Sequence, residues 1–172
     1  MDIIEMIKYS VPALIVFFTA FFMMRYYMQK EARERKVDLV IRNQQTITPL
    51  RLQAYERLAL FLERINPESM LMRVNQPGMN SQQLQSQLLA TIRAEFEHNL
   101  SQQIYITPQA WEVVKNAKNN TIKLINTSAD KVKPNAPAME LNRHILEKVI
   151  ETEAAPSQAA LEFLKKEVST FF

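Results

Sequence analysis

The sequence contains no cysteine, and only one of its 172 residues is a glycine, Gly78. Without cysteine the chain cannot form disulfides, use a thiol nucleophile or carry the lipid of a lipoprotein. One glycine is too few for a phosphate-binding loop or for the Gly-x-Ser-x-Gly turn of hydrolases. Sheets need glycine at tight turns, whereas helices exclude it. Because Leu, Ala, Gln, Glu, Lys and Arg dominate instead, the composition predicts an all-α protein.

An excess of one charge sign is also missing from most of the chain. The formal net charge is +3, but residues 37–172 hold 15 basic and 14 acidic residues. A nucleic-acid-binding domain usually carries a clustered basic excess. The near balance therefore argues against nucleic acid as the main partner of this region.

The chain does have a long apolar run near its start, VPALIVFFTAFFMMRYYM, residues 11–28. Extended back to Tyr9 it contains twenty residues, about 30 Å of helix, which matches the hydrocarbon core of a bilayer. A cleaved signal would need a small-residue cleavage site, and FFMMRYY offers none. A buried core helix is the other alternative, but it does not explain the basic cluster that follows. The run predicts an uncleaved transmembrane anchor, residues 1–28.

Residues that prefer a membrane interface flank this run. Tyrosine rings favour the headgroup level, and Lys and Arg favour the cytoplasmic side. We expect eight residues at the interface: Tyr9, Arg25, Tyr26, Tyr27, Lys30, Arg33, Arg35 and Lys36. Because the basic residues follow the run, the N-terminus is predicted outside, with residues 29–47 forming a basic juxtamembrane helix. The sequence thus predicts a single-pass protein of the bacterial inner membrane whose C-terminal domain is cytoplasmic.

Small residues recur at three- and seven-residue steps within the predicted span, at Ser10, Ala13 and Ala20. Small side chains let a second transmembrane helix approach closely. These residues are predicted to pack against another span, and ordinary span composition is the alternative explanation.

Residues 48–172 are predicted to form a bundle of about five helices. Proline follows a capping residue at Thr48-Pro49, Asn66-Pro67 and Thr107-Pro108, as is typical of helix starts. Asn66-Pro67 opens a short helical turn, Pro77-Gly78 is a turn, and the following helix starts at Asn80 or Ser81. The predicted helices are 49–65, 81–103, 108–132, 138–152 and 157–171.

The apolar pattern of these helices predicts which side chains face the core. In 49–65 the inward arc holds Leu50, Ala54, Tyr55, Leu58, Phe61, Leu62 and Ile65. In 138–152 all six large apolar residues are predicted to face inward: Met139, Leu141, Ile145, Leu146, Val149 and Ile150.

A possible metal motif occurs in EFEH, where Glu95 and His98 have the Glu-x-x-His spacing of di-metal bundles. His144 with Glu140 would be the second half, but its offset is wrong. Both histidines also fall away from the apolar arcs of their helices. The sequence therefore predicts solvent-facing histidines, no cofactor and no catalytic site.

A partner-binding surface is predicted from arginine, leucine and methionine between residues 52 and 79. Arginine suits interfacial contacts and methionine adapts to irregular surfaces. The candidate residues are Leu52, Arg57, Leu60, Arg64, Met70, Met72, Arg73 and Met79. The alternative is that a helix in the middle of a small bundle needs apolar residues on two sides.

Two segments carry a resemblance to a known group of proteins. They are PLRLQAYERLALFLERINPESMLMRV and QLLATIRAEFEHNLSQQIYITPQAW, which together cover roughly Pro49–Trp111. They resemble an uncharacterised family of small single-span proteins from Bacteroidota, and the KKEV region near the C-terminus resembles it loosely. The resemblance implies an inner-membrane protein with a cytoplasmic helical domain, and it brings no activity, cofactor or catalytic residue.

Together these features predict a non-enzymatic, membrane-anchored helical scaffold or accessory subunit. Its expected partners are the lipid bilayer and a protein or larger inner-membrane complex, and it could also form a homo-oligomer. Two alternatives are a membrane-tethered factor that binds nucleic acid or the ribosome, and a carboxylate–histidine metal-binding bundle.

Overall fold

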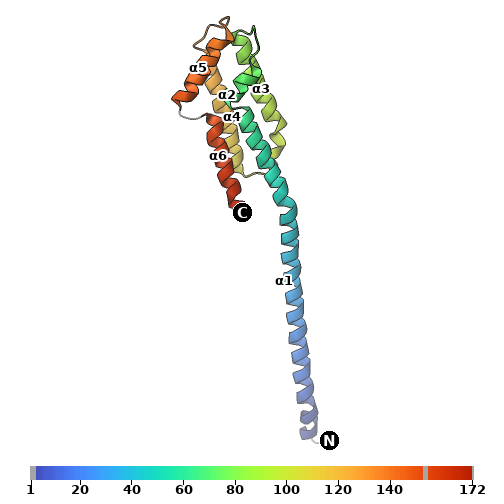
Figure 1. The fold of residues 1–172 in the computed structure, drawn as a ribbon. Helices are drawn as coiled ribbons and strands as arrows, with labels where there is room; N and C mark the ends of the chain where they lie inside the picture. The colour runs from blue at the N-terminus through green and yellow to red at the C-terminus, as the bar shows by residue number, and fades with distance from the viewer. Residues whose placement is uncertain (1–2, 153–154, 172) are drawn as a thin grey trace. The chain divides into compact units, whose positions relative to one another are not determined.

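The computed structural model describes the backbone of residues 3–152 and 155–171; ahead of residue 49 it describes the side chains of residues 14–31, 35, 41 and 44–48. The described residues form helices and no β-strand, which confirms the all-α prediction (Figure 1). One isolated bridge joins Asn80 and Pro137. The elements are α1 (Ile3–Arg64), α2 (Pro67–Val74), α3 (Ser81–His98), η1 (Leu100–Ile104), α4 (Pro108–Ala129), α5 (Ala138–Glu151), α6 (Pro156–Val168) and η2 (Ser169–Phe171).

The chain divides into two compact units, Met1–Thr48 and Pro49–Phe172. The predicted break between a helix over residues 29–47 and a new helix over residues 49–65 is wrong, because α1 is helical from Ile3 to Arg64. Pro49 therefore lies inside a helix, where its fixed φ is compatible with the helix but its missing N–H and the bulk of its ring disfavour it. Leu50 was expected in the core, but it lies 43% exposed, one residue after this proline.

The prediction of a transmembrane anchor is corrected by the N-terminal unit. Throughout the part of the chain that the structure describes, no helix is both long enough and apolar enough to cross a bilayer. The predicted single-pass location in an inner membrane, with its orientation, is therefore overturned.

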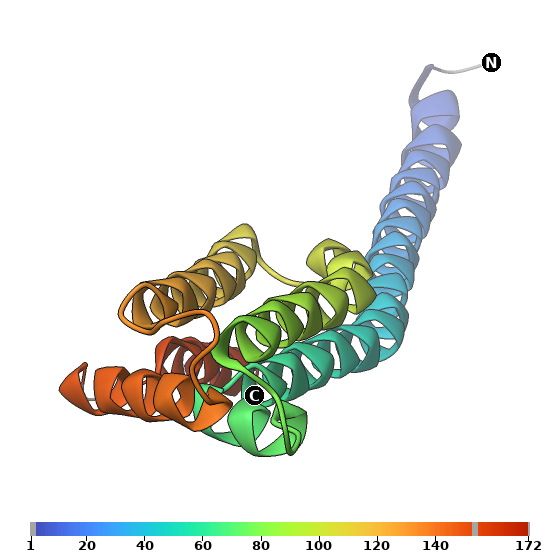
Figure 2. The same cartoon turned by 90° about the horizontal axis from the view of Figure 1, so that it is seen from above.

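The C-terminal unit is built around a continuous hydrophobic core to which α1 to α6 all contribute. The apolar spacing in α3 places Leu84, Leu88 and Ile92 on one face, and all three are fully buried. Figures 1 and 2 show α3 and α4 side by side, and α4 also packs against α5 and α6. Fully burying one such side chain contributes about 1.5 to 3 kcal/mol. The largest buried side chains are Phe61, Leu58, Leu62, Ile65, Met70, Leu84, Leu88, Ile92, Ile125, Leu141, Ile145 and Leu164.

Aromatic rings connect α1, α3 and α4 at one side of this core. The rings of Phe61 and Phe96 lie 5.9 Å apart, and Phe96 stacks on Trp111 at 5.3 Å. Lys118 places its Nζ 4.1 Å from the centre of the Phe96 ring, which is a cation–π contact.

The predicted caps at Asn66, Asn80 and Thr107 form, whereas the predicted cap at Thr48 does not, because Thr48 lies inside α1. Thr107 accepts a hydrogen bond from the N–H of Ala110 at 3.1 Å, ahead of α4. At the start of α3 the side chain of Asn80 accepts from the N–H of Gln83, and the Gln83 side chain accepts from the N–H of Asn80. This reciprocal capping box satisfies two helix-end donors. The predicted end of this helix near residue 103 was too late, because α3 ends at His98 and η1 follows.

Candidate functional site

The short helix α2 forms one wall of the candidate site. Asn66 caps it by accepting from the N–H of Glu68 at 3.0 Å, and Pro67 occupies its first turn. The helix is eight residues long. One of its faces is buried in the core, and the other is exposed to solvent. Leu71 is 5% exposed on the inner side, whereas Met72 is 83% exposed.

The helix α5 forms the opposite wall, and it carries two apolar faces. Leu141, Ile145 and Val149 are buried in the core as predicted. The expectation that every large apolar residue of this helix faces inward is wrong for three others, which are exposed: Met139 (68%), Leu146 (38%) and Ile150 (76%). At 100° per residue the centre of the exposed stripe lies about 120° around the helix from the centre of the buried one, so the neighbouring helices of the bundle cover only the buried stripe.

A hydrogen-bonded linker fixes the end of α5 that lies next to α3. The N–H of Ala138 donates to the carbonyl of Met79 at 3.2 Å. The hydroxyl of Ser81 donates to the carbonyl of Ala136 at 2.9 Å, and the N–H of Ser81 donates to that same carbonyl. Ser81 is buried, so these bonds are shielded from water. They hold the start of α5, and therefore its outer apolar stripe, in a defined place.

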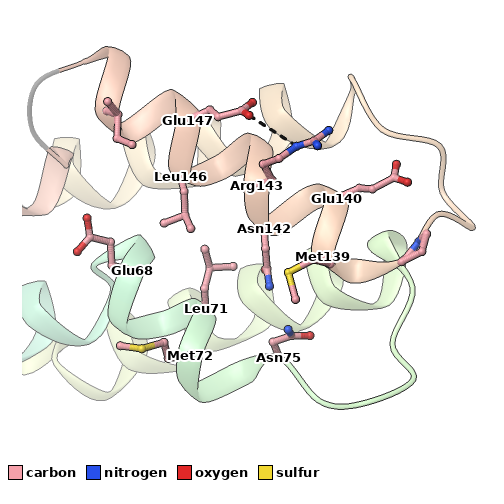
Figure 3. A pocket seen from close by; sticks show the side chains of 12 residues that line it. Glu68, Leu71, Met72, Asn75, Met139, Glu140, Asn142, Arg143, Leu146 and Glu147 are labelled. Carbon is pink, nitrogen blue, oxygen red and sulfur yellow. Dashed lines mark ion pairs between the residues drawn. The ribbon is translucent and has the colours of Figure 1, made fainter.

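Between α2 and α5 lies a groove with a volume of about 880 Å³ (Figure 3). Its apolar lining consists of Leu71, Met72, Pro137, Met139, Leu146 and Ile150. In Figure 3, Leu146 from α5 and Leu71 from α2 point toward one another across the space between the two helices. From Met139 to Ile150 the wall is about 16 Å long, or three helical turns. We refer to this site as the α2–α5 groove.

Charged side chains surround the apolar part of the α2–α5 groove. Three carboxylates line it, Glu68, Glu140 and Glu147, together with one guanidinium, Arg143. Arg143 Nε lies 3.6 Å from a carboxylate oxygen of Glu147, so this pair neutralises itself. Within the described residues, no cationic group lies at ion-pair distance from Glu68 or Glu140. The edge of the groove is therefore acidic.

The structure distributes the predicted partner-binding residues over several places. Met72 alone among them lines the α2–α5 groove, Met70 is fully buried, and Met79 is partly buried against the core. Leu52 lines a small hollow of about 280 Å³ beside α6. Arg73 is exposed and donates to the carbonyl of Arg64.

Three further residues of that set do lie together. Arg57, Leu60 and Arg64 line a hollow of about 640 Å³ between α1 and α3. Arg64 is occupied there, because its Nε donates to Glu95 at 2.6 Å. Leu60 is 58% exposed at this hollow, which makes it a useful comparison for the α2–α5 groove.

The fold does not gather the residues of the possible metal motif into one site, although Glu95 and His98 line the same hollow between α1 and α3. The Glu95 carboxylate pairs with Arg64, and His98 is exposed at the end of α3. Glu140 lines the α2–α5 groove, while His144 Nδ1 lies 3.4 Å from Glu147. Among the residues described, no three potential ligands gather where they could hold an ion.

The residues predicted for a membrane interface or for packing between spans are only partly described. The side chains of Tyr9, Ser10, Ala13, Arg33 and Lys36 lie outside the described residues. The others are exposed: Ala20, Arg25, Tyr26, Tyr27, Lys30 and Arg35. Arg35 forms an ion pair with Glu31 one turn earlier. No membrane role is assigned to these residues, because the predicted span is not supported.

Sequence reasoning missed the α2–α5 groove, although part of its pattern was visible. Met139, Leu146 and Ile150 repeat at steps of seven and four, which is a helical stripe of its own. The prediction combined this stripe with Leu141, Ile145 and Val149 into one broad inward face, so a separate outer stripe was not recognised. Its location opposite Met72 depends on the tertiary packing of α2, which no local pattern reveals.

The chain belongs to a family of unknown function (DUF7935), whose model matches residues 1–171. This agrees with the expected membership of an uncharacterised family. No curated protein and no solved structure matches the chain.

Proposed function

We propose that this chain is a non-enzymatic docking module that recruits a protein partner through the α2–α5 groove. The observation that carries the proposal is the second apolar stripe of α5. Met139 and Ile150 are more than two-thirds exposed, and Met72 faces the same groove from α2 at 83% exposure. Burying such side chains against a partner is the main source of binding free energy in protein interfaces.

Several features of the groove favour a protein partner over a small substrate. The groove is an open channel about three helical turns long, and apolar side chains dominate its lining. Its histidine-free lining offers carboxylates, one guanidinium and amides. Methionine at both walls suits a surface that adapts to a partner's side chains.

The two alternatives from the sequence have weaker support. A metal-binding bundle would need Glu95 and His98 to converge with further ligands, and the Glu95 carboxylate is paired with Arg64. A nucleic-acid surface would need arginines that are available for phosphate, whereas Arg64 is paired and Arg73 donates to a backbone carbonyl. Nucleic-acid binding is kept as an outcome that the experiment below can detect.

Site-specific photocrosslinking in living cells tests the proposal. A photoreactive phenylalanine replaces Met72 in the full-length chain, and in a parallel strain it replaces Ile104. The second position lies on η1, outside the groove, and Ile104 is 75% exposed. We expect a discrete protein adduct from position 72 and none from position 104.

Matched substitutions then show whether the groove itself makes the contact. Ile150→Glu should abolish the adduct from position 72, because Ile150 lines the groove. Ile104→Glu should preserve the adduct and is the matched control, because Ile104 is as exposed as Ile150 but lies outside the groove. Leu60→Glu tests the arginine-lined surface that the sequence suggested. An adduct that Leu60→Glu removes and Ile150→Glu leaves intact would reject the groove. A nuclease-sensitive adduct would support the nucleic-acid alternative.

A further inference from the structure

We infer that the occupant of the α2–α5 groove is a single basic amphipathic helix of a partner protein. This inference rests on the proposed docking function, and it adds the secondary structure and charge of the partner. The shape, the spacing of the apolar residues and the charges of the groove each bear on it.

The shape of the groove fits one helix. Its two walls are helices, and its length from Met139 to Ile150 is about 16 Å, which accommodates three turns of a docked helix. The described residues of the C-terminal unit present no strand edge to which an extended peptide could add. A helix would insert side chains spaced three, four or seven residues apart between Leu146 and Met72.

The charges at the edge of the groove favour a partner helix that is positively charged. Glu68 stands on α2 and Glu140 on α5, and neither has a cationic partner among the described side chains. Glu147 is already paired with Arg143. Lys or Arg residues that flank an apolar stripe would therefore find two unpaired carboxylates, one on each wall. An acidic helix would place like charges there, and such juxtapositions are costly.

Peptide binding to the purified full-length chain tests this inference. The probes are two fluorescein-labelled model helices with the same leucine stripe, one with lysine and one with glutamate at every polar position. Fluorescence anisotropy is measured at low and at high salt. We expect the leucine–lysine helix to bind at least about tenfold more tightly than the leucine–glutamate helix, and to weaken as salt is raised.

Charge reversal separates the groove from the general charge of the protein. Glu68→Lys combined with Glu140→Lys should invert the preference between the two peptides. The matched control is Glu97→Lys combined with Glu162→Lys, which changes the net charge equally at exposed sites outside the groove lining. The control should retain the preference for lysine. Ile150→Glu should remove peptide binding, and Ile104→Glu should not.

The possible failures are distinguishable. Equal binding of both peptides, or inversion by the control pair as well, would overturn the basic-helix inference. It would leave the docking function intact if the adduct at position 72 still depended on Ile150. An adduct at position 72 that no longer depended on Ile150 would overturn both the basic-helix inference and the proposed docking function. A concentration-dependent dimer in light scattering that Ile150→Glu dissociates would show that a second copy fills the groove, and it would also overturn the inference.

Discussion

Arg64 places both its Nε and its Nη2 on one carboxylate oxygen of Glu95, at 2.6 and 2.5 Å. The two residues are 31 positions apart and join the end of α1 to α3. The sequence suggested Arg64 for a partner surface and Glu95 for a metal motif. In the fold each is the partner of the other, so the pair contributes to holding the bundle together.

Removing this pair should therefore lower stability. Glu95 is only 17% exposed, while Arg64 is 44% exposed and partly screened by water. We expect Arg64→Met to lower the free energy of unfolding by about 1 kcal/mol. A double-mutant cycle with Glu95→Gln, measured by urea denaturation, should give a coupling energy of about 0.5 to 1 kcal/mol. Additive effects would show that the contact contributes nothing.

The two faces of α5 can be compared directly with one kind of substitution. Ile145 is fully buried and Ile150 is 76% exposed on the same helix. Ile145→Ala should cost about 3 kcal/mol because it leaves a cavity, whereas Ile150→Ala should change stability by less than about 0.5 kcal/mol. Chemical denaturation of the two variants checks this. A large loss for Ile150→Ala would mean that the outer stripe is part of the core.

The only glycine of the chain occupies a turn that requires it. Gly78 has φ of +87°, and a Cβ added there would meet nothing within 4 Å. The cost of Gly78→Ala is therefore purely conformational, and we expect about 1 kcal/mol of destabilisation. Gly78→Asn should cost less, because asparagine tolerates positive φ. Equal stability of the alanine variant and the parent would contradict this account.

Tyr55 links stability to alkaline pH. Burial raises the pKa of Tyr55 above the ordinary value of 10.0, and the negative charge of the nearby Glu167 carboxylate also raises it. The polar backbone and side-chain groups of Thr107 lower this pKa in part. The folded protein therefore retains the proton at a pH where the unfolded chain loses it. The resulting contribution is complete below pH 10 and is lost as pH rises through the folded-state pKa. Tyr55→Phe should flatten the fall of stability above pH 10 in thermal melts.

The same substitution tests the environment of the Tyr55 hydroxyl at neutral pH. The hydroxyl is buried without a hydrogen bond of good geometry to any described residue, and the ring packs edge-on against Phe171 at 5.5 Å. Tyr55→Phe retains the ring contact and removes the unsatisfied group. We expect unchanged or slightly higher stability, by up to about 1 kcal/mol. A clear loss would show that the hydroxyl is paired.

Glu151 provides a local test at acidic pH. The hydrogen bond from Lys148, at 2.8 Å, and the charge of that lysine lower the pKa of Glu151 below 4.5, and Lys131 adds to the effect. Because the pKa of Glu151 is lower in the folded state, its ionised carboxylate stabilises the fold at a pH above the pKa that the group has in the unfolded chain. This contribution disappears as the pH falls through the folded-state pKa. Lys148→Gln should move the pKa of Glu151 back toward its ordinary value in an NMR titration. Lys123→Gln, on α4, is the control and should not.

The sequence alone determined the local features of this protein. Helix caps at Thr107 and Asn80, the turn at Gly78 and the buried stripe of α3 follow from neighbouring residues, so they could be predicted. The end of α3 was not predicted well, because helix ends fray and local signals place them only approximately. The continuity of α1 through Pro49 was not predicted either, because proline usually starts a helix and is disfavoured inside one.

The tertiary structure alone decided which apolar and charged residues remain available to a partner. Leu141 and Leu146 look alike in sequence, yet one is fully buried in the core and the other lines the α2–α5 groove. Arg64 found a partner 31 residues away, whereas Glu68 and Glu140 found none among the described side chains. The reason is physical: periodicity fixes the direction of a side chain around its own helix axis, but burial depends on which other helices pack there.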